Sequence, residues 1–436
     1  MANGTFQIPQ GIQNRRVRLD FMADLSPSTS STLQPTQGRE RIEFLDVLRG
    51  FAILGILVVN FEGYGFSGLY GTQVSDRWPS LAQRLAESLI TWFGTGKFNI
   101  IFTFLFGLGF ALQLQRAEDR GQPISARYSR RLIGLLLIGV AHKFFVWAGD
   151  ILVTYALMGF VLLLFRGIRG KPLLACALLL YVAALLPWEM HELQRVQEET
   201  AHSIGQLHTD PSATEHPISP REAGVAQTYA RGTFRDIMAL RFSEAMLGFR
   251  RGYNSFAHVL GLFLLGLYAG KKRIFQRLGD YKREFQSLLV WGGMIGISGA
   301  ALLHYSYWKG LPGWSGLLRP PLFGASTLAL SGAYAAGLQV LSGFSKTRAV
   351  FNGLARVGQM ALTNYVLQSL ICTWIFYSYG LGMYGQIGPL LGLGLTGIIY
   401  LSQVALSVWW LRHARYGPLE WVLRSITYNQ LQPIWR

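Results

Sequence analysis

The sequence predicts an all-α polytopic membrane protein with about ten transmembrane helices and with the N and C termini in the cytoplasm. Half of the 436 residues are hydrophobic and only 14% are charged, a balance that a soluble globular protein of this length does not tolerate. The apolar residues form long runs, and arginine and lysine gather in connections between them. Basic connections of this kind mark the cytoplasmic side, so we expect a multi-pass protein of the inner (plasma) membrane with the lipid bilayer as its main partner.

The net charge of +17 does not indicate a nucleic-acid-binding protein here, because the basic residues lie beside apolar runs, as cytoplasmic loops require. The two cysteines, Cys176 and Cys372, lie inside apolar runs and have no CxxC or metal-ligand spacing. We therefore expect neither a disulfide framework nor a metal site.

The segment 127–171 predicts a transmembrane hairpin. Its two apolar runs, 132–146 and 151–165, are each long enough to cross most of a bilayer once flanking residues are added. The connection between them is only a few residues, so the two helices must be antiparallel. Basic residues at both outer flanks place those flanks in the cytoplasm: Arg127, Arg130, Arg131, Arg166, Arg169 and Lys171. The tip, on the outer side, carries the ionisable residues His142, Lys143 and Asp150, which need partners or a function at this depth.

The N-terminal part of the chain divides into a tail and a transmembrane half. Residues 1–38 are rich in Ser, Thr, Gln, Asn and Pro and predict a disordered cytoplasmic tail. Residues 39–190 predict five spans, near 44–66, 98–114, 132–146, 151–165 and 173–187. Asp46 and Arg49 stand at i,i+3 at the inner end of the first span, where they can form an ion pair.

The remainder predicts an external loop, a second transmembrane half and a tail. Residues 191–251 are polar, lie outside by alternation, and hold histidines without regular metal spacing: His191, His202, His208 and His216. Residues 252–411 contain five more apolar runs, near 255–270, 285–304, 321–341, 354–377 and 387–411. In the cytoplasmic tail 412–436, the break at Pro418 and the following apolar pattern predict a helix on the inner leaflet, with Glu420 and Arg424 paired at i,i+4.

Six polar residues near the outer ends of the first four spans are candidate site residues: Asn60, Glu62, Lys97, Asn99, His142 and Asp150. If neighbouring spans pack together, these residues converge on one pocket that opens to the outside. A histidine beside a carboxylate is the usual arrangement for general-base catalysis, because the carboxylate fixes the tautomer and stabilises the imidazolium. Two structural alternatives remain open. Asp150 can simply cap the helix that follows it, and His142 can be a packed interhelical residue.

In the ninth span, Asn364 and Gln368 lie on one helix face at i,i+4. Amides near the membrane middle either join helices through hydrogen bonds or line a cavity. The glycines of GFAILGIL, FGLGF and GLGLTG favour close helix packing over phosphate binding, since the sequence contains no P-loop and no GxGxxG motif that follows a strand.

Five motifs, in order, resemble the YeiB-type bacterial inner-membrane family: RIEFLDVLRGFAILGILVVNFEGYG, KFNIIFTFLFGLGFALQ, LIGVAHKFFVWAGDILVTYAL, GQMALTNYVLQSL and RYGPLEWVLRSITY. The resemblance covers 39–428, and the family's C-terminal half is classed as a domain of unknown function. Through LDVLRG and the asparagine of the first span, the chain is more distantly similar to the transmembrane acyltransferase superfamily that includes heparan-alpha-glucosaminide N-acetyltransferase. Those enzymes move acetyl from cytosolic acetyl-CoA to a sugar amine across the membrane. The resemblance implies a catalytic histidine in the loop after the first span, but 67–97 contains none, so His142 has to take that role.

The resulting hypothesis is an acyltransferase that brings a cytosolic acyl donor to a hydroxyl or amine of a small-molecule or glycan acceptor on the outer side. His142 is the general base, Asp150 orients it, and Asn60 or Asn364 donates to the oxyanion. Predicted substrate-binding residues are Glu62, Lys97, Asn99, Asn364 and Gln368. Predicted donor-phosphate residues are Arg49, Arg127, Arg130 and Arg131. We expect no permanently bound cofactor, with acyl-CoA as a donor substrate, and the sequence leaves the oligomeric state open. The rival hypothesis is a transporter or permease for a small solute that uses the same polar residues.

Overall fold

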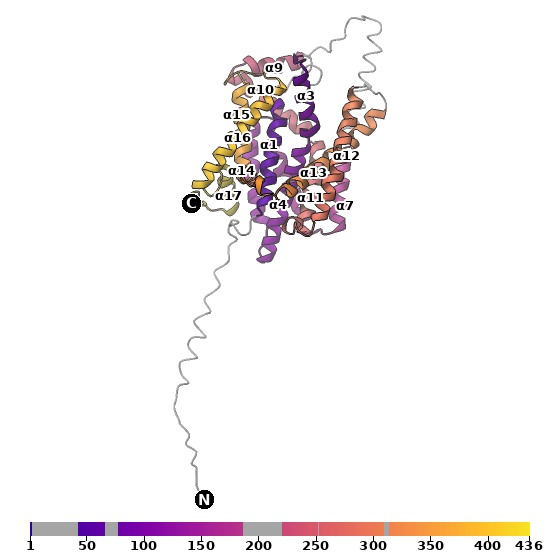
Figure 1. The fold of residues 1–436 in the computed structure, drawn as a ribbon. Coiled ribbons are helices and arrows are strands. Elements are labelled where there is room, and N and C mark those ends of the chain that lie inside the picture. The colour runs from indigo at the N-terminus through magenta and orange to yellow at the C-terminus, as the bar shows by residue number, and fades with distance from the viewer. Residues whose placement is uncertain (2–41, 66–76, 186–219, 252, 309–313) are drawn as a thin grey trace. The chain divides into compact units, whose positions relative to one another are not determined.

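The computed structural model describes residue 1 and residues 42–65, 77–185, 220–251, 253–308 and 314–436 (Figure 1). The chain forms two compact units, Met1–Glu40 and Arg41–Arg436. Apart from residue 1, the predicted tail lies outside the described residues, as do the four histidines of the predicted external loop. All regular elements in the described part of the second unit are helices, which confirms the predicted all-α class.

The α-helices follow one another with short connections. They are α1 (Glu43–Gly65), α3 (Leu81–Leu89), α4 (Lys97–Asp119), α5 (Ser125–Phe145), α6 (Leu152–Leu162), α7 (Lys171–Ala183), α9 (Pro220–Arg231), α10 (Phe234–Arg251), α11 (Tyr253–Lys271), α12 (Lys282–Trp308), α13 (Trp314–Leu341), α14 (Arg348–Gln359), α15 (Ala361–Phe376), α16 (Pro389–His413) and α17 (Pro418–Tyr428). A π-helix, η2 (Ile90–Gly94), joins α3 to the start of α4, and short 3-10 helices lie at Leu163–Gly167, Ile274–Gln276 and Ser345–Thr347.

Among the described residues, four helical segments are long and apolar enough to cross a membrane: Glu43–Gly65, Leu81–Asp119, Lys282–Ser306 and Pro389–His413. Four shorter apolar helices accompany them, at Leu152–Gly167, Lys171–Ala183, Phe256–Lys271 and Ala361–Phe376. Apolar helices of this length are what a bilayer requires, because lipid leaves backbone polar groups no partner outside the helix. These segments confirm that the chain has the helices of a membrane protein, and the exact span count stays a prediction.

Two parts of the chain differ from the predicted elements. The run 354–377 is not one span, because the helix is interrupted at Met360, whose φ of −113° and ψ of 33° separate α14 from α15. The described end of the polar loop, from residue 220, is helical and folds as α9 and α10, and α10 packs against α5. Loop polarity hid these two helices, since their apolar faces are short.

Two helix crossings depend on glycine, as the GFAILGIL and FGLGF motifs predict. Between α1 and α14, a Cβ added to Gly50 would lie 2.0 Å from Leu354 O, and one added to Gly358 would lie 1.9 Å from Asp46 O. Backbones this close leave no room for any side chain. The third motif, GLGLTG, differs. A Cβ at Gly392 would lie 3.1 Å from the Phe61 ring, whereas Gly394 and Gly397 face open space, so the packing role holds for only one of the three.

The crossing of α4 and α11 has the same construction. A Cβ on Gly107 would lie 2.0 Å from Phe263 O, and a Cβ on Gly266 would lie 2.1 Å from Phe104 O. Gly109, two residues along α4, has nothing within 4 Å of the same position. The two glycines therefore set the separation of the helices, while Gly109 does not.

The predicted helix after Pro418 is confirmed as α17, but its carboxylate has another partner than the one predicted. Glu420 Oε1 accepts hydrogen bonds from Leu362 N (2.7 Å) and Thr363 N (3.1 Å), and Oε2 accepts one from Thr363 Oγ1 (2.6 Å). Glu420 thus caps the N-terminus of α15 instead of pairing with Arg424, whose guanidinium lies 4.4 Å from the centre of the Tyr416 ring. Burial raises the pKa of Glu420, and the donors of Thr363 and Leu362 lower it in part.

Helix α5 connects two ends of the bundle. Near its N-terminus, α17 packs on it, and Arg130 Nε donates to Thr427 O at 3.1 Å. At its C-terminus, α10 packs on it through Arg241, which donates to Phe145 O at 2.6 Å (Figure 1). The last turn of α5 carries His142, so the fold places this histidine beneath α10.

Candidate functional site

His142 and Asp150, here called the dyad, are in direct contact across the α5–α6 turn. His142 Nδ1 lies 2.9 Å from Asp150 Oδ1, and the exposed fractions of the two side chains are 1% and 0%. The turn is tight because the N–H groups of Val146 and Trp147 both donate to His142 O, each at 2.9 Å. With Asp150 ionised, Nδ1 carries the proton and Nε2 is left as the basic nitrogen.

Asp150 also caps the helix that follows it. Its Oδ2 accepts a hydrogen bond from Val153 N at 2.9 Å, which satisfies one of the free N–H groups at the start of α6. The two interpretations that the sequence left open, cap and orienting carboxylate, are therefore both present in the geometry, with one oxygen serving each. The cap holds the carboxylate in place, which in turn fixes the imidazole ring.

The far side of the imidazole has no partner. His142 Nε2 is buried and makes no hydrogen bond within the part of the chain that the structure describes, and the same holds for Tyr365 Oη. The rings of His142 and Tyr365 lie 5.2 Å apart, centre to centre. Tyr365 belongs to α15 and was not among the predicted site residues. The signal was present in TNYVLQ, where Tyr365 follows Asn364, but Tyr365 lies outside the i,i+4 face of Asn364 and Gln368 that drew attention to this helix.

Aromatic residues from α1 and the turn lie close to this arrangement. Trp147, in the turn, packs on Tyr64 of α1 with ring centres 4.1 Å apart. The Tyr64 hydroxyl is 2.7 Å from Ser369 Oγ of α15. Helices α1 and α15 and the hairpin tip therefore meet beside the dyad, and both tyrosines are buried. The surroundings are apolar and closed, which strengthens electrostatic interactions inside them.

Two cations lie at the outer end of α5. Arg241 is fully buried; its Nη1 donates to Phe145 O and its Nη2 donates to Tyr379 Oη at 3.0 Å. The guanidinium also faces the rings of Tyr377 and Tyr379, at 5.3 and 5.9 Å. Lys143 Nζ donates to Ala148 O at 2.9 Å. Arg241 thus ties α10 to the end of α5 and to the loop after α15, close to the dyad. The sequence gave no signal for it, because it stands in a polar segment.

The other outer-half candidates do not join the dyad. Lys97 is buried, donates to Thr91 O at 3.2 Å, and lies 5.9 Å from the ring centre of Phe323 on α13. The backbone carbonyl of Asn99 accepts a hydrogen bond from Thr103 Oγ1. In the described residues, no hydrogen bond or ion pair connects Lys97 or Asn99 to the dyad, so the predicted convergence holds for the α5–α6 tip alone.

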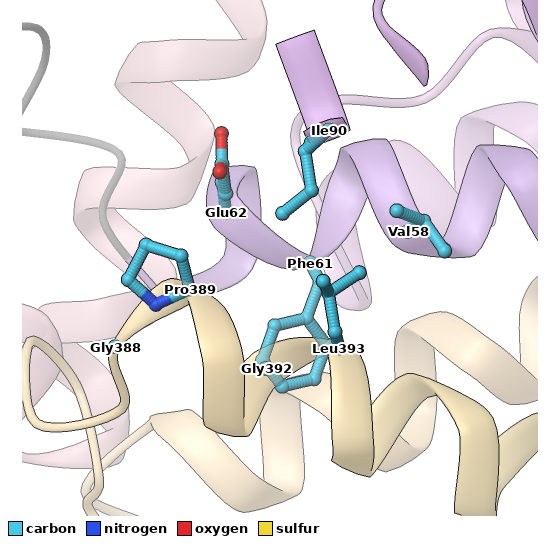
Figure 2. A pocket seen from close by; sticks show the side chains of 8 residues that line it. All are labelled: Val58, Phe61, Glu62, Ile90, Gly388, Pro389, Gly392 and Leu393. Carbon is cyan, nitrogen blue, oxygen red and sulfur yellow. The ribbon is translucent and has the colours of Figure 1, made fainter. Parts of the chain in front are cut away.

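Glu62 belongs to a separate, small pocket between α1, η2 and α16 (Figure 2). Besides Glu62, its lining residues are apolar or glycine: Val58, Phe61, Ile90, Gly388, Pro389, Gly392 and Leu393. The Glu62 carboxylate points away from the Phe61 ring in Figure 2. Asn60 is half-buried, and its side chain has no hydrogen bond to any described residue. Neither residue contributes to the dyad.

The amides of the ninth predicted span join helices. Asn364 Nδ2 donates to Val357 O (3.2 Å) and Ser407 Oγ (3.0 Å), and Gln368 Nε2 donates to Gln403 Oε1 (2.9 Å). Gln403 Nε2 returns a bond to Asn364 O at 2.9 Å. Because both amide donors of Asn364 are already used, its predicted role as an oxyanion donor is wrong. The interhelical alternative describes Asn364 and Gln368 correctly, and we call this set with Gln403 and Ser407 the amide network.

The predicted donor-phosphate arginines lie near the other end of α5 or on α1. Arg49 pairs with Asp46, as predicted from their spacing. Arg127 donates to Gln122 Oε1 at 3.3 Å and lies over the Tyr428 ring, and Arg130 is bound to α17. Arg131 Nε is buried without a hydrogen-bond partner in the described residues. These contacts hold α5 to its neighbours, and the role in donor binding stays a prediction.

Among the described residues, no group of three or more His, Cys, Asp or Glu side chains could hold a metal ion. Cys176 and Cys372 are both free thiols, separated in sequence and in different helices. The chemistry of the site therefore has to be argued from the dyad and from Tyr365.

Helices of membrane-spanning length around a buried histidine–carboxylate pair define an integral membrane protein with a polar site inside the helix bundle. Residues 269–430 match the family described as "Protein of unknown function (DUF418)". The chain is 36% identical over 413 residues to the uncharacterized protein YxaH of Bacillus subtilis (strain 168), which covers 93% of this chain and 98% of that protein. It is 29% identical over 420 residues to the uncharacterized protein YeiB of Escherichia coli (strain K12), which covers 90% of this chain and 98% of that protein.

A third relative is an uncharacterized 39.9 kDa protein encoded in the amylase 3' region of Bacillus acidopullulyticus, 29% identical over 422 residues. That match covers 92% of this chain and 98% of the relative. The chain belongs to the YeiB-type family, as the five sequence motifs predicted.

Proposed function

We propose that this protein is an integral membrane acyltransferase that moves an acyl group from a cytosolic donor to a hydroxyl or amine acceptor on the outer side. The observation that supports it is the buried dyad with an unoccupied basic nitrogen. Asp150 holds His142 Nδ1, and His142 Nε2 has no partner among the described residues. A purely structural histidine satisfies both ring nitrogens, whereas a general base needs one nitrogen free.

The transfer step uses this free nitrogen. As the acceptor oxygen or nitrogen attacks the carbonyl carbon of the thioester, His142 Nε2 takes the acceptor's proton and the carbonyl oxygen becomes an oxyanion. Asp150 stabilises the imidazolium that forms. When the carbon–sulfur bond breaks, the imidazolium returns its proton to the thiolate. The products are the acylated acceptor and free CoA thiol, so atoms and charge balance.

The proposal includes a topology of about ten spans, with both termini in the cytoplasm and α10 on the outer side. Arg127 and His142 stand on the same helix, about 22 Å apart at a rise of ~1.5 Å per residue. Such a separation suits a donor whose phosphates remain near the inner arginines while its thioester arm extends along α5. Because the dyad is closed in this structure, the helices around it have to part for substrates to enter.

Cysteine labelling tests this topology. In a background with Cys176 and Cys372 replaced by alanine, Ser243→Cys on α10 is expected to react with a membrane-impermeant maleimide in intact cells. Ser345→Cys, exposed in the basic connection before α14, is expected to react only after permeabilisation. Reaction of both from the same side would overturn the span count, and the reverse pattern would overturn the orientation.

The proposed activity is tested on the purified full-length protein. Mass spectrometry is expected to find a CoA species among the ligands that copurify with it. Incubation with acetyl-CoA and glucosamine, used as an amine probe, is expected to release free CoA thiol and to acetylate the amine. Recovery of a small solute without any CoA species, together with no thiol release, would instead favour the transporter.

A further inference from the structure

Two buried polar atoms beside each other lack partners, and they come from distant parts of the chain. His142 Nε2 and Tyr365 Oη are both without a hydrogen bond in the part of the chain that the structure describes. The two residues are only 2% and 4% exposed, and their rings are 5.2 Å apart. Buried polar atoms are nearly always paired in native proteins, because an unpaired one retains its full desolvation cost. Two such atoms on adjacent rings indicate a position that a third polar group occupies.

The Tyr365 hydroxyl is placed next to the reacting part of the dyad. The backbone N–H of Ile151, the residue after Asp150, lies near Tyr365 Oη, although not in hydrogen-bond geometry. A hydroxyl in this position keeps its own proton available for donation. His142 Nε2 is an acceptor when Nδ1 carries the proton, so one ring offers an acceptor and the other a donor.

The helix that carries Tyr365 is held rigidly from three directions. At its N-terminus, Glu420 accepts the N–H groups of Leu362 and Thr363. One residue before Tyr365, Asn364 binds Ser407 of α16, and four residues after it, Ser369 binds Tyr64 of α1. A donor fixed in this way needs no reorganisation when charge develops, which is the requirement for an oxyanion donor.

We propose that Tyr365 is a further catalytic residue, whose hydroxyl donates a hydrogen bond to the thioester carbonyl oxygen as that oxygen becomes negative. This inference rests on the proposed acyltransferase function. Tyr365 keeps its proton throughout, while His142 removes the acceptor's proton and later returns it to the departing thiolate. Tyr365 thereby takes the role that the sequence had assigned to Asn60 or Asn364.

The test is Tyr365→Phe in the purified full-length protein, with thiol release from acetyl-CoA in the presence of glucosamine as the readout. Loss of an oxyanion donor is expected to lower kcat by roughly 10²–10³-fold, with KM changed by less than about threefold. Because the hydroxyl has no partner to lose, the melting temperature is expected to stay within about 2 °C or to rise.

Tyr155→Phe is the matched control. Tyr155 is also a fully buried tyrosine in a neighbouring helix, but its hydroxyl is hydrogen-bonded to Thr103 Oγ1. Its loss is expected to lower the melting temperature and to leave kcat within about threefold of the native value, because it removes a satisfied hydrogen bond.

The possible failures can be separated. If the native protein releases no thiol, the proposed function fails and the Tyr365 assignment falls with it. If the native protein is active and His142→Ala is inactive, while Tyr365→Phe keeps its full kcat, only the Tyr365 assignment is wrong. A Tyr365→Phe variant that loses activity and melting temperature together, as a structural residue would, also overturns it.

Discussion

His142→Ala and Asp150→Asn are each expected to reduce acyl transfer by roughly 10²–10⁴-fold, the range for loss of a general base or of its orienting partner. Asparagine is as good a helix cap as aspartate, so Asp150→Asn keeps the bond to Val153 N while it removes the ionised partner of His142. The double variant is expected to be little worse than either single one, because residues that act as a unit are not additive. The readout is thiol release from acetyl-CoA, with melting temperature measured in parallel.

Asp236→Asn is the matched control for the dyad experiment. Asp236 accepts hydrogen bonds from Thr233 N and Oγ1 at the start of α10, so it also stabilises a helix N-terminus but is fully exposed and separate from the dyad. Its replacement is expected to leave activity unchanged. If Asp150→Asn were as active as Asp236→Asn, Asp150 would be a cap and nothing more, with its complete removal costing about 1 kcal/mol of stability.

Replacement of Gly107 or Gly266 is expected to have the largest effect on folding. Even an alanine at Gly107 places its Cβ 2.0 Å from Phe263 O, and an alanine at Gly266 places it 2.1 Å from Phe104 O. The obstructing atoms belong to helix backbones, so the clash is relieved only if α4 and α11 move apart along their whole contact. We expect a loss of ~3 kcal/mol or more, at the upper end of overpacking effects, seen as a lowered melting temperature or as loss of the monodisperse peak in size-exclusion chromatography.

Gly109→Ala provides the comparison on the same helix. With nothing within 4 Å of the added Cβ, this variant is expected to be neutral or stabilised by up to ~1 kcal/mol, the difference in helix propensity between glycine and alanine. Equal melting temperatures for Gly107→Ala and Gly109→Ala would contradict the close crossing of α4 and α11.

The site could be predicted from sequence only where it is local. His142 and Asp150 stand at the two ends of one short turn, so the hairpin prediction already brought them near each other. Lys97 and Asn99 were grouped with them because they come from a neighbouring span. The structure instead places Lys97 toward Phe323 of α13, since packing of α4 with α11 and α13 sets how α4 is rotated about its axis.

Helix α15 shows the same limit from the other side. The i,i+4 spacing of Asn364 and Gln368 correctly identified one polar face, but spacing cannot tell whether that face meets a cavity or another helix. It meets α16, where Gln403 and Ser407 complete the amide network. Tyr365, one residue along the helix, points elsewhere and reaches the dyad.

By itself, the sequence determined that the described chain is helical and suited to a membrane, because long apolar runs can satisfy their backbone in lipid only as helices. It also determined the family, through motifs spread over most of the chain, and the contact of His142 with Asp150, which depends on a turn of few residues. Only the tertiary structure decided that Met360 divides a predicted span, that Arg241 is buried over the end of α5, and that Tyr365 faces His142. These features depend on how closely and at what rotation distant helices approach one another, and that is set by backbone contacts such as those of Gly50 and Gly358, which no single helix contains.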